Sequence, residues 1–183
     1  MAIDALERRT PLGPLAARVR HVCSGERFSC REDAFRTLVE VRCADGSAAA
    51  AAAIVGGELP AVGRLAMIDT SFVIGLGPQW WMIDAPDGRA PLKSLAGVSA
   101  VDVSAQRSPF VLEGTAVRDV LAHGMALDLH PDLFPGGAAA QTLLAKAAVI
   151  VARSGPDQYR VWVRASFARY LAMWLMDASV EYR

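Results

Sequence analysis

The sequence predicts an α+β fold in which helices pack on a mostly antiparallel sheet. Short apolar segments of strand length are separated by turns rich in Gly, Pro and Asp, and they occur in groups rather than in strict alternation with helices. The clearest helical pattern stands near the C-terminus, where apolar residues recur every three or four positions from Phe167 to Ala178. We expect an extended N-terminal arm over residues 1–30, followed by a single α+β domain over residues 31–183.

The expected arm holds few packing signals of its own. Pro11, Gly13 and Pro14 interrupt any helix there. Its apolar residues, which suit docking on a neighbouring chain, are Leu12, Leu15 and Val19. Removal of residues 1–20 is therefore expected to weaken assembly more than it unfolds the domain.

A strand and a helix follow the arm. From Phe35 to Cys43 the residues alternate weakly between apolar and polar, which predicts a half-buried strand. Ser47 is placed to cap a helix through the alanine run, because alanine loses little side-chain entropy in a helix. Gly56 supplies the C-terminal stop of that helix.

Three short strands are predicted next, over Arg64–Asp69, Phe72–Leu76 and Gln79–Asp84. The third, QWWMID, is apolar on both faces. Trp80 and Met82 point to one face of the strand, and Trp81 and Ile83 point to the other. A strand of this kind cannot face water on either side. It must lie centrally between two layers or beneath a partner.

The second half of the chain predicts further strands and two well-marked helices. A helix capped by Thr115 is expected to end at Ala122, and the final helix is expected to begin at Ser166. The other predicted elements are a short helix over Ala90–Ala96, a strand pair of Val98–Ser104 with Phe110–Glu113, an irregular loop over Leu127–Gly137, and strands over Ala140–Leu144, Ala148–Ala152 and Tyr159–Val163.

The composition excludes several classes of protein. Hydrophobic residues make up 53% of the 183, so the chain can bury a core without disulfides or metal and still has apolar surface for partners. The 19 basic residues (Lys and Arg together) equal the 19 acidic residues (Asp and Glu together), so the sequence lacks the basic excess of a nucleic-acid-binding protein. No segment approaches the roughly 20 apolar residues of a membrane-spanning helix. We therefore expect neither a nucleic-acid partner nor a membrane span.

The cysteines indicate a reducing compartment. Cys23, Cys30 and Cys43 are odd in number and form no C-x-x-C motif, and Met1–Thr10 lacks the apolar core of a signal peptide. Structural disulfides are rare in the cytoplasm, so the sequence predicts reduced thiols and a cytoplasmic location. Together with His21, the three cysteines fit no closed zinc pattern, because structural zinc sites bring close ligand pairs from two turns. No metal site is expected.

The other chemistry-bearing residues form no recognisable catalytic set. His123 stands at the predicted end of a helix, and His130 stands in a loop between Asp128 and Asp132, but neither accompanies a nucleophile motif. The run Gly75-Leu76-Gly77-Pro78 resembles the start of a phosphate-binding loop but lacks the rest of that motif, so a turn is predicted.

The tryptophans are expected to pack in the core, with an interface role for Trp80 or Trp81 as the alternative. The sequence thus predicts no catalytic, cofactor-binding or metal-binding residue.

Several segments, in order, resemble the gamma subunit of heterotetrameric sarcosine oxidase. The resemblance runs from about Ser47 to the end of the chain, and the arm segment Pro11–Arg18 is also typical. The segments are LGPQWWMI (Leu76–Ile83), VDVSAQRSPFVLEGTAVRDVLA (Val101–Ala122), LDLHPDLFPGG (Leu127–Gly137), AQTLLAKAAVIVAR (Ala140–Arg153) and VRASFARYLAMWLMDASVEY (Val163–Tyr182).

The resemblance implies both a function and a fold. Members belong to a complex that oxidises sarcosine to glycine and hydrogen peroxide and, with tetrahydrofolate, yields 5,10-methylenetetrahydrofolate. The alpha, beta and delta subunits would be the partners, and they would carry FAD, FMN, NAD, zinc and the folate site. The gamma chain would carry no cofactor, and its fold would resemble the folate-binding domain of aminomethyltransferases such as the glycine-cleavage T-protein.

Two departures from the aminomethyltransferase pattern predict a non-catalytic role. Ala105 follows Asp102-Val103-Ser104 where the related D-V-S-H segment has histidine, and the segment Ala145–Val151 has no carboxylate where active members carry an acidic pair.

Two alternatives stay open at this point. One is a stand-alone folate-dependent one-carbon transferase, for which Asp102 and Asp128 are the only candidate acids. The other is the equivalent subunit of an enzyme acting on N-methylglutamate or dimethylglycine. The subunit interfaces are expected at the arm through His21, at Trp80 or Trp81, and at the His130 loop.

Overall fold

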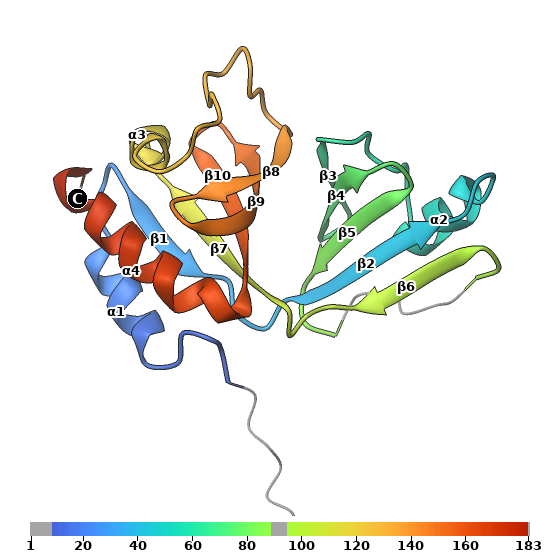
Figure 1. The fold of residues 1–183 in the computed structure, drawn as a ribbon, viewed down its shortest axis with the longest axis horizontal. Helices are drawn as coiled ribbons and strands as arrows, with labels where there is room; N and C mark the ends of the chain where they lie inside the picture. Colours follow the sequence, from blue (N-terminus) through green and yellow to red (C-terminus); the bar gives the residue numbers. More distant parts are fainter. Residues whose placement is uncertain (1–8, 89–94, 183) are drawn as a thin grey trace, which may run out of the picture.

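The computed structural model describes residues 9–88 and 95–182, which form two five-stranded antiparallel sheets and four α-helices (Figure 1). The α+β prediction is confirmed. The helices are α1 Leu15–Val22, α2 Ala48–Val55, α3 Val117–Ala122 and α4 Ala168–Ala178. The strands are β1 Ser29–Glu32, β2 Thr37–Cys43, β3 Leu65–Ile68, β4 Ser71–Gly77, β5 Trp80–Ala85, β6 Val98–Asp102, β7 Arg107–Glu113, β8 Ala139–Leu144, β9 Ala147–Gly155 and β10 Gln158–Arg164.

The chain crosses between the two sheets twice. The first sheet has the strand order β1-β7-β10-β9-β8, and the second has the order β3-β4-β5-β2-β6. Residues 33–36 carry the chain from β1 to β2, and residues 103–106 return it from β6 to β7. Because β1 and β7 are hydrogen-bonded neighbours, the whole second sheet is inserted between two adjacent strands of the first.

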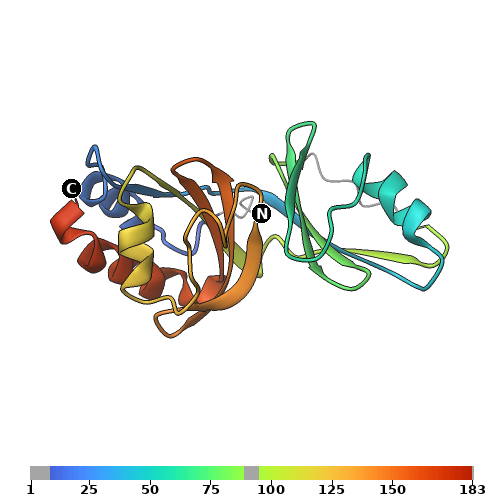
Figure 2. The same ribbon diagram turned by 90° about the horizontal axis from the view of Figure 1, so that it is seen from above.

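The first sheet is covered on one face by three helices, α1, α3 and α4, as Figures 1 and 2 show. The final helix buries Leu171 and Leu175 against this core, as its spacing predicts. Phe167 and Tyr170 of the same predicted stripe are exposed instead. Residues 165–167 form a 3-10 turn before α4, so Ser166 does not cap the helix as predicted.

The second sheet is buried on both faces at β5. Trp81 and Ile83 pack with residues of α2, while Met82 packs against the first sheet beside Ile150 and Trp162. This arrangement agrees with the first of the two predicted alternatives, in which QWWMID lies centrally between two layers. The α2 helix ends at Gly56 in the left-handed conformation (φ 82°), as predicted, whereas Ser47 at its N-cap makes no side-chain hydrogen bond.

The prediction of an extended arm over residues 1–30 is wrong for the residues that the structure describes. Residues 15–22 form α1, and residues 29–32 form β1. Leu12 and Val19 are fully buried in the first core, so they do not form a docking surface on a neighbour. Loss of residues 1–20 would remove part of this core, and we now expect it to unfold the chain.

The predicted pairing of Val98–Ser104 with Phe110–Glu113 is also wrong. The two segments form β6 and β7, but β6 pairs with β2 in the second sheet, and β7 pairs with β1 and β10 in the first. Strand periodicity reports which residues are buried, not which strand is the neighbour. Residue 116, rather than Thr115, is the N-cap of α3. The helix predicted over Ala90–Ala96 lies largely outside the described residues.

The single-domain organisation predicted for residues 31–183 stays a prediction. A mixed cluster joins the two sheets through side chains of both, including Leu38, Ile74 and Trp162. Such a cluster favours cooperative unfolding. Denaturation followed by fluorescence and by circular dichroism would test the single-domain prediction. Coincident curves are expected, and separate transitions would contradict it.

Gly75 lies inside β4 rather than in the predicted turn, which falls at residues 78–79. A Cβ atom at Gly75 would stand 2.2 Å from the carbonyl oxygen of Ala61. Backbone cannot move away as a side chain can, so only glycine fits there.

We predict that Gly75→Ala lowers the free energy of unfolding by about 1–3 kcal/mol, the usual effect of overpacking. The matched control is Gly136→Ala, because a Cβ atom there has no neighbour within 4 Å. Urea denaturation would measure both, and equal midpoints for Gly75→Ala and the unsubstituted chain would contradict the prediction.

Candidate functional site

A buried ionic cluster lies where the two sheets meet. Asp84 near the end of β5 is fully buried and accepts a hydrogen bond of 2.5 Å from Arg36 Nε. Arg36 stands in the first crossing segment and also donates to the Asp84 main-chain carbonyl at 2.9 Å. From the first sheet, Trp162 Nε1 donates to Asp84 Oδ2 at 2.8 Å. One carboxylate thus joins both sheets and the connection between them.

Arg160 on β10 extends the cluster. Its guanidinium lies 3.6 Å from Asp84 Oδ2 and also pairs with Asp33. It stacks over the ring of Phe72 with 4.4 Å to the centroid. Arg36 Nε lies 3.7 Å from Asp33 as well, so two cations and two carboxylates alternate across the junction. The formal charge of these four side chains sums to zero.

Burial acts on both kinds of charge in this cluster. It raises the pKa of Asp84, an effect that the positive charges of Arg160 and Arg36 oppose. It also lowers the pKa of Arg160, against the opposing effect of Asp84. Each charge therefore needs its partner. Both carboxylate oxygens of Asp84 accept hydrogen bonds from other parts of the chain, one from the crossing segment and one from the first sheet. This geometry suits a role in holding the two sheets together.

We predict that Asp84→Ala lowers the free energy of unfolding by about 3–5 kcal/mol, since it leaves the buried Arg160 and the partly buried Arg36 to share Asp33 as their one remaining counter-charge in the cluster. Asp84→Asn should cost less, because an amide oxygen can still accept from Trp162. Asp132→Ala is the control, since the Asp132 side chain is 88% exposed, and it should change stability by no more than about 0.5 kcal/mol. Denaturation midpoints would decide, and similar midpoints for Asp84→Ala and Asp132→Ala would refute this role.

The cysteines and His21 are not brought together. Cys23 and Cys30 are buried side by side in the first core, whereas Cys43 lies at the end of β2 in the second sheet. Burial raises the pKa of Cys30 well above its ordinary value, which disfavours the thiolate that a metal needs. Within residues 9–88 and 95–182, no group of three or more His, Cys, Asp or Glu side chains is arranged to hold a metal ion.

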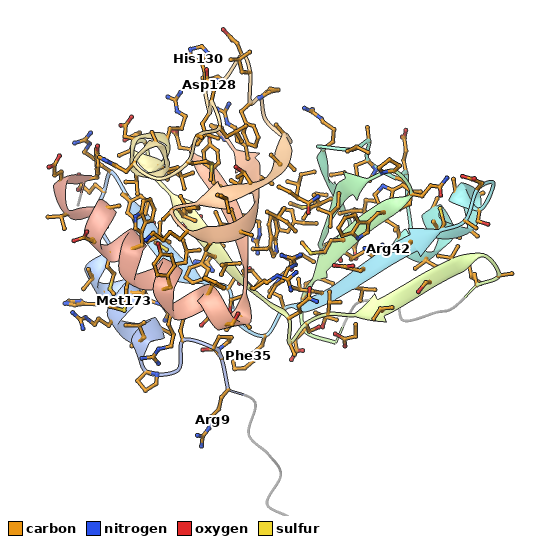
Figure 3. The ribbon with its side chains drawn as sticks, in the orientation of Figure 1. Arg9, Phe35, Arg42, Asp128, His130 and Met173 are labelled. Atoms are coloured by element: carbon orange, nitrogen blue, oxygen red, sulfur yellow. The ribbon has the colours of Figure 1, made fainter. Side chains whose placement is uncertain are left out.

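The other two histidines are exposed and far from the ionic cluster. His123 lies beside Tyr182, with 3.2 Å between Nε2 and the phenol oxygen. His130 stands with Asp128 at the tip of the loop before β8 (Figure 3), and its Nδ1 lies 3.5 Å from Asp132. Asp128 accepts a hydrogen bond from the His130 main-chain N–H at 2.8 Å, so it shapes the loop.

The residues that match the aminomethyltransferase pattern lie at the end of β6, in the second crossing segment, and at the start of β9. Asp102 accepts from the main-chain N–H of Ser104 in a tight turn, and Ala105 lies at the next bend. The segment 145–151 contributes Val149, Ile150 and Val151 to the cores, where they present only hydrocarbon. A cavity between the two sheets at Ile150 has a volume of about 150 Å³, below the roughly 300 Å³ at which small-molecule pockets begin.

The tryptophans are confirmed as core residues at two positions. Trp162 is fully buried, and Trp81 is 8% exposed and donates to the Pro60 carbonyl at 2.9 Å. Trp80 is half-buried beneath the guanidinium of Arg42, which lies 4.3 Å from its ring centroid.

The sequence analysis missed the ionic cluster. Arg36, Asp84 and Arg160 are separated by up to 124 positions, and no motif connects them. The sequence carries a signal for two of these residues. Asp84 follows the apolar residues 80–83, and Arg160 stands among the apolar residues of 159–163, where a charge is buried and needs a partner.

Comparison with known proteins assigns the family. The family model for the sarcosine oxidase gamma subunit matches residues 41–181. The chain belongs to this family. The gamma subunit of sarcosine oxidase from Corynebacterium sp. strain U-96 is 37% identical over 193 residues, which cover 98% of this chain and 94% of the relative. The gamma subunits from Corynebacterium sp. strain P-1 and from an Arthrobacter species are each 35% identical and cover 96% of this chain.

Comparison with solved structures gives the same family assignment. A chain of heterotetrameric sarcosine oxidase from Corynebacterium sp. U-96, in complex with pyrrole 2-carboxylate, superposes on this gamma-family chain with a TM-score of 0.87 and 36% identity, covering 96% of both. The glycine cleavage system aminomethyltransferase T from Bartonella henselae gives a TM-score of 0.61 at 17% identity over 50% of its length. The second likeness confirms the predicted fold relationship and shows the fold alone.

No helix within the described residues is long and apolar enough to cross a membrane.

Proposed function

We propose that this chain is the non-catalytic gamma subunit of a heterotetrameric sarcosine oxidase and assembles with alpha, beta and delta subunits. The observation that carries the proposal is the match over 96% of both chains to a chain of such a complex. The complex would oxidise sarcosine to glycine and hydrogen peroxide and, with tetrahydrofolate, form 5,10-methylenetetrahydrofolate. FAD, FMN, NAD, zinc and the folate would lie on the other subunits. The three cysteines form no disulfide with one another, which supports a cytoplasmic location.

The buried polar groups support a structural role for the chain. Asp84 is enclosed by Arg36 and Trp162, so its carboxylate cannot reach a substrate amine. Ala105 offers no proton-transferring group where the related transferases carry histidine. The charges of the buried cluster therefore hold the two sheets of the chain together.

The exposed apolar side chains support assembly with other subunits. Met173 on the outer face of α4 is 60% exposed (Figure 3). Tyr170 on the same helix and Phe167 in the 3-10 turn before it are also exposed, and their rings are in contact. Leu133 in the loop before β8 is 69% exposed. Side chains of this kind are stabilised when a partner removes them from water.

We predict that the chain co-purifies with the alpha, beta and delta subunits when all four are expressed together, because its exposed apolar side chains gain burial there. The isolated chain should turn over no sarcosine, whereas the complex should form hydrogen peroxide. Size-exclusion chromatography and a peroxide assay would measure both. A monomer that ignores the other subunits, or turnover by the isolated chain, would contradict the proposal.

We also predict that the isolated chain binds no tetrahydrofolate, since apolar side chains fill the space between the sheets. Isothermal calorimetry would measure it, with the assembled complex as the positive control. Saturable one-to-one binding by the isolated chain would favour the stand-alone transferase instead. Turnover of the complex with sarcosine, N-methylglutamate and dimethylglycine would identify its amine.

A further inference from the structure

A wide groove runs along the place where the chain crosses between the two sheets. Its volume is about 1210 Å³. Both crossing segments form its walls, and Phe35 projects there at the base of the molecule (Figure 3). The lining residues on which the inference depends are Glu32, Phe35, Arg36, Val101, Ala105 and Arg107.

Two buried polar atoms of opposite kind belong to this lining. Glu32 is 7% exposed, and its Oε1 accepts from Ser108 at 2.9 Å, but its Oε2 has no hydrogen-bond partner within the described residues. Arg107 Nε is likewise buried without an acceptor in that part of the chain. A buried donor or acceptor left unpaired destabilises the protein, and more so when it is charged. An occupant that brings a donor to Glu32 and an acceptor to Arg107 would remove this cost.

The backbone at the groove is held in a sparsely populated conformation. Phe35 has φ 62°, a left-handed conformation that is strained for a residue with a Cβ atom. The side chain is 43% exposed, so its own core does not bury it fully. Val101, 53% exposed, lines the same groove. Strain that presents an aromatic side chain at a concave surface points to a binding role.

We propose that this groove docks an extended segment of a partner subunit, which places an apolar side chain against Phe35 and Val101 and a lysine or arginine on Glu32. A main-chain carbonyl of the same segment would accept from Arg107. The inference rests on the proposed function, because the partner is one of the other subunits of the complex.

The size and chemistry of the groove favour a polypeptide over a small molecule. Pockets for small ligands occupy roughly 300–1,000 Å³ and enclose their ligand, whereas this groove is larger and open. The main-chain N–H and C=O groups of an extended segment supply donors and acceptors together. The unpaired oxygen of a buried carboxylate selects a cationic side chain.

The test is competitive assembly. A variant chain and a mass-distinguishable unsubstituted chain are co-expressed in equal amounts with the alpha, beta and delta subunits. The ratio of the two gamma chains in the purified complex is then read by mass spectrometry. Phe35→Gly should be disfavoured about thirtyfold, as for an aromatic hot spot. Glu32→Gln, which still accepts from Ser108 but loses the charge, should be disfavoured about tenfold.

The control separates binding from backbone effects. Asp69→Gly makes the same kind of change at a left-handed residue (φ 51°) in the turn between β3 and β4, outside the groove, and should be incorporated equally with the unsubstituted chain. Phe35→Gly should leave the melting temperature of the isolated chain within about 3 °C, because glycine accepts this φ without strain. Equal incorporation of Phe35→Gly or Glu32→Gln would overturn the groove proposal. So would a disadvantage shared by Asp69→Gly. Failure of the unsubstituted chain to enter the complex would instead refute the proposed function, and the groove proposal with it.

Discussion

The buried carboxylate of Asp84 is the constraint on which the arrangement of the two sheets depends. It accepts hydrogen bonds from a side chain of the crossing segment and from a side chain of the first sheet, although it belongs to the second. Burial makes its charge costly, and the cost is offset only while Arg36 and Arg160 stand close to it. Since the second sheet is inserted between β1 and β7, this cluster fixes the position of one sheet against the other.

Apolar side chains of both sheets also pack at this junction. The aminomethyltransferase likeness shows how the strands are connected, but the space between the sheets is filled by Met82, Ile150 and Trp162. A ligand would have to displace a packed cluster and break the Trp162 bond to Asp84. The two sheets are therefore joined by an apolar cluster as well as by the buried charges.

Several features follow from local patterns in the sequence. The sequence predicts that β5 needs cover on both faces because Trp80 and Met82 on one face and Trp81 and Ile83 on the other are apolar, and the structure shows that the cover comes from within the chain. The end of α2 at Gly56 follows from the freedom of glycine to adopt positive φ. The family follows from segments such as LDLHPDLFPGG, whose order along the chain is retained. Each of these depends on residues that are close together in the sequence.

Other features depend on contacts between distant residues, and only the tertiary structure decided them. Leu12 and Val19 lie in a segment with helix-breaking residues, yet the first core buries them, because α4 at the other end of the chain covers α1. The neighbours of β6 and β7 were decided by the crossing of the chain between sheets. Asp84 and Arg160 stand 76 positions apart in the sequence. An ion pair between residues so far apart produces no local sequence pattern from which it could be predicted. Side-chain periodicity specifies a buried face, whereas the identity of the covering element depends on the whole fold.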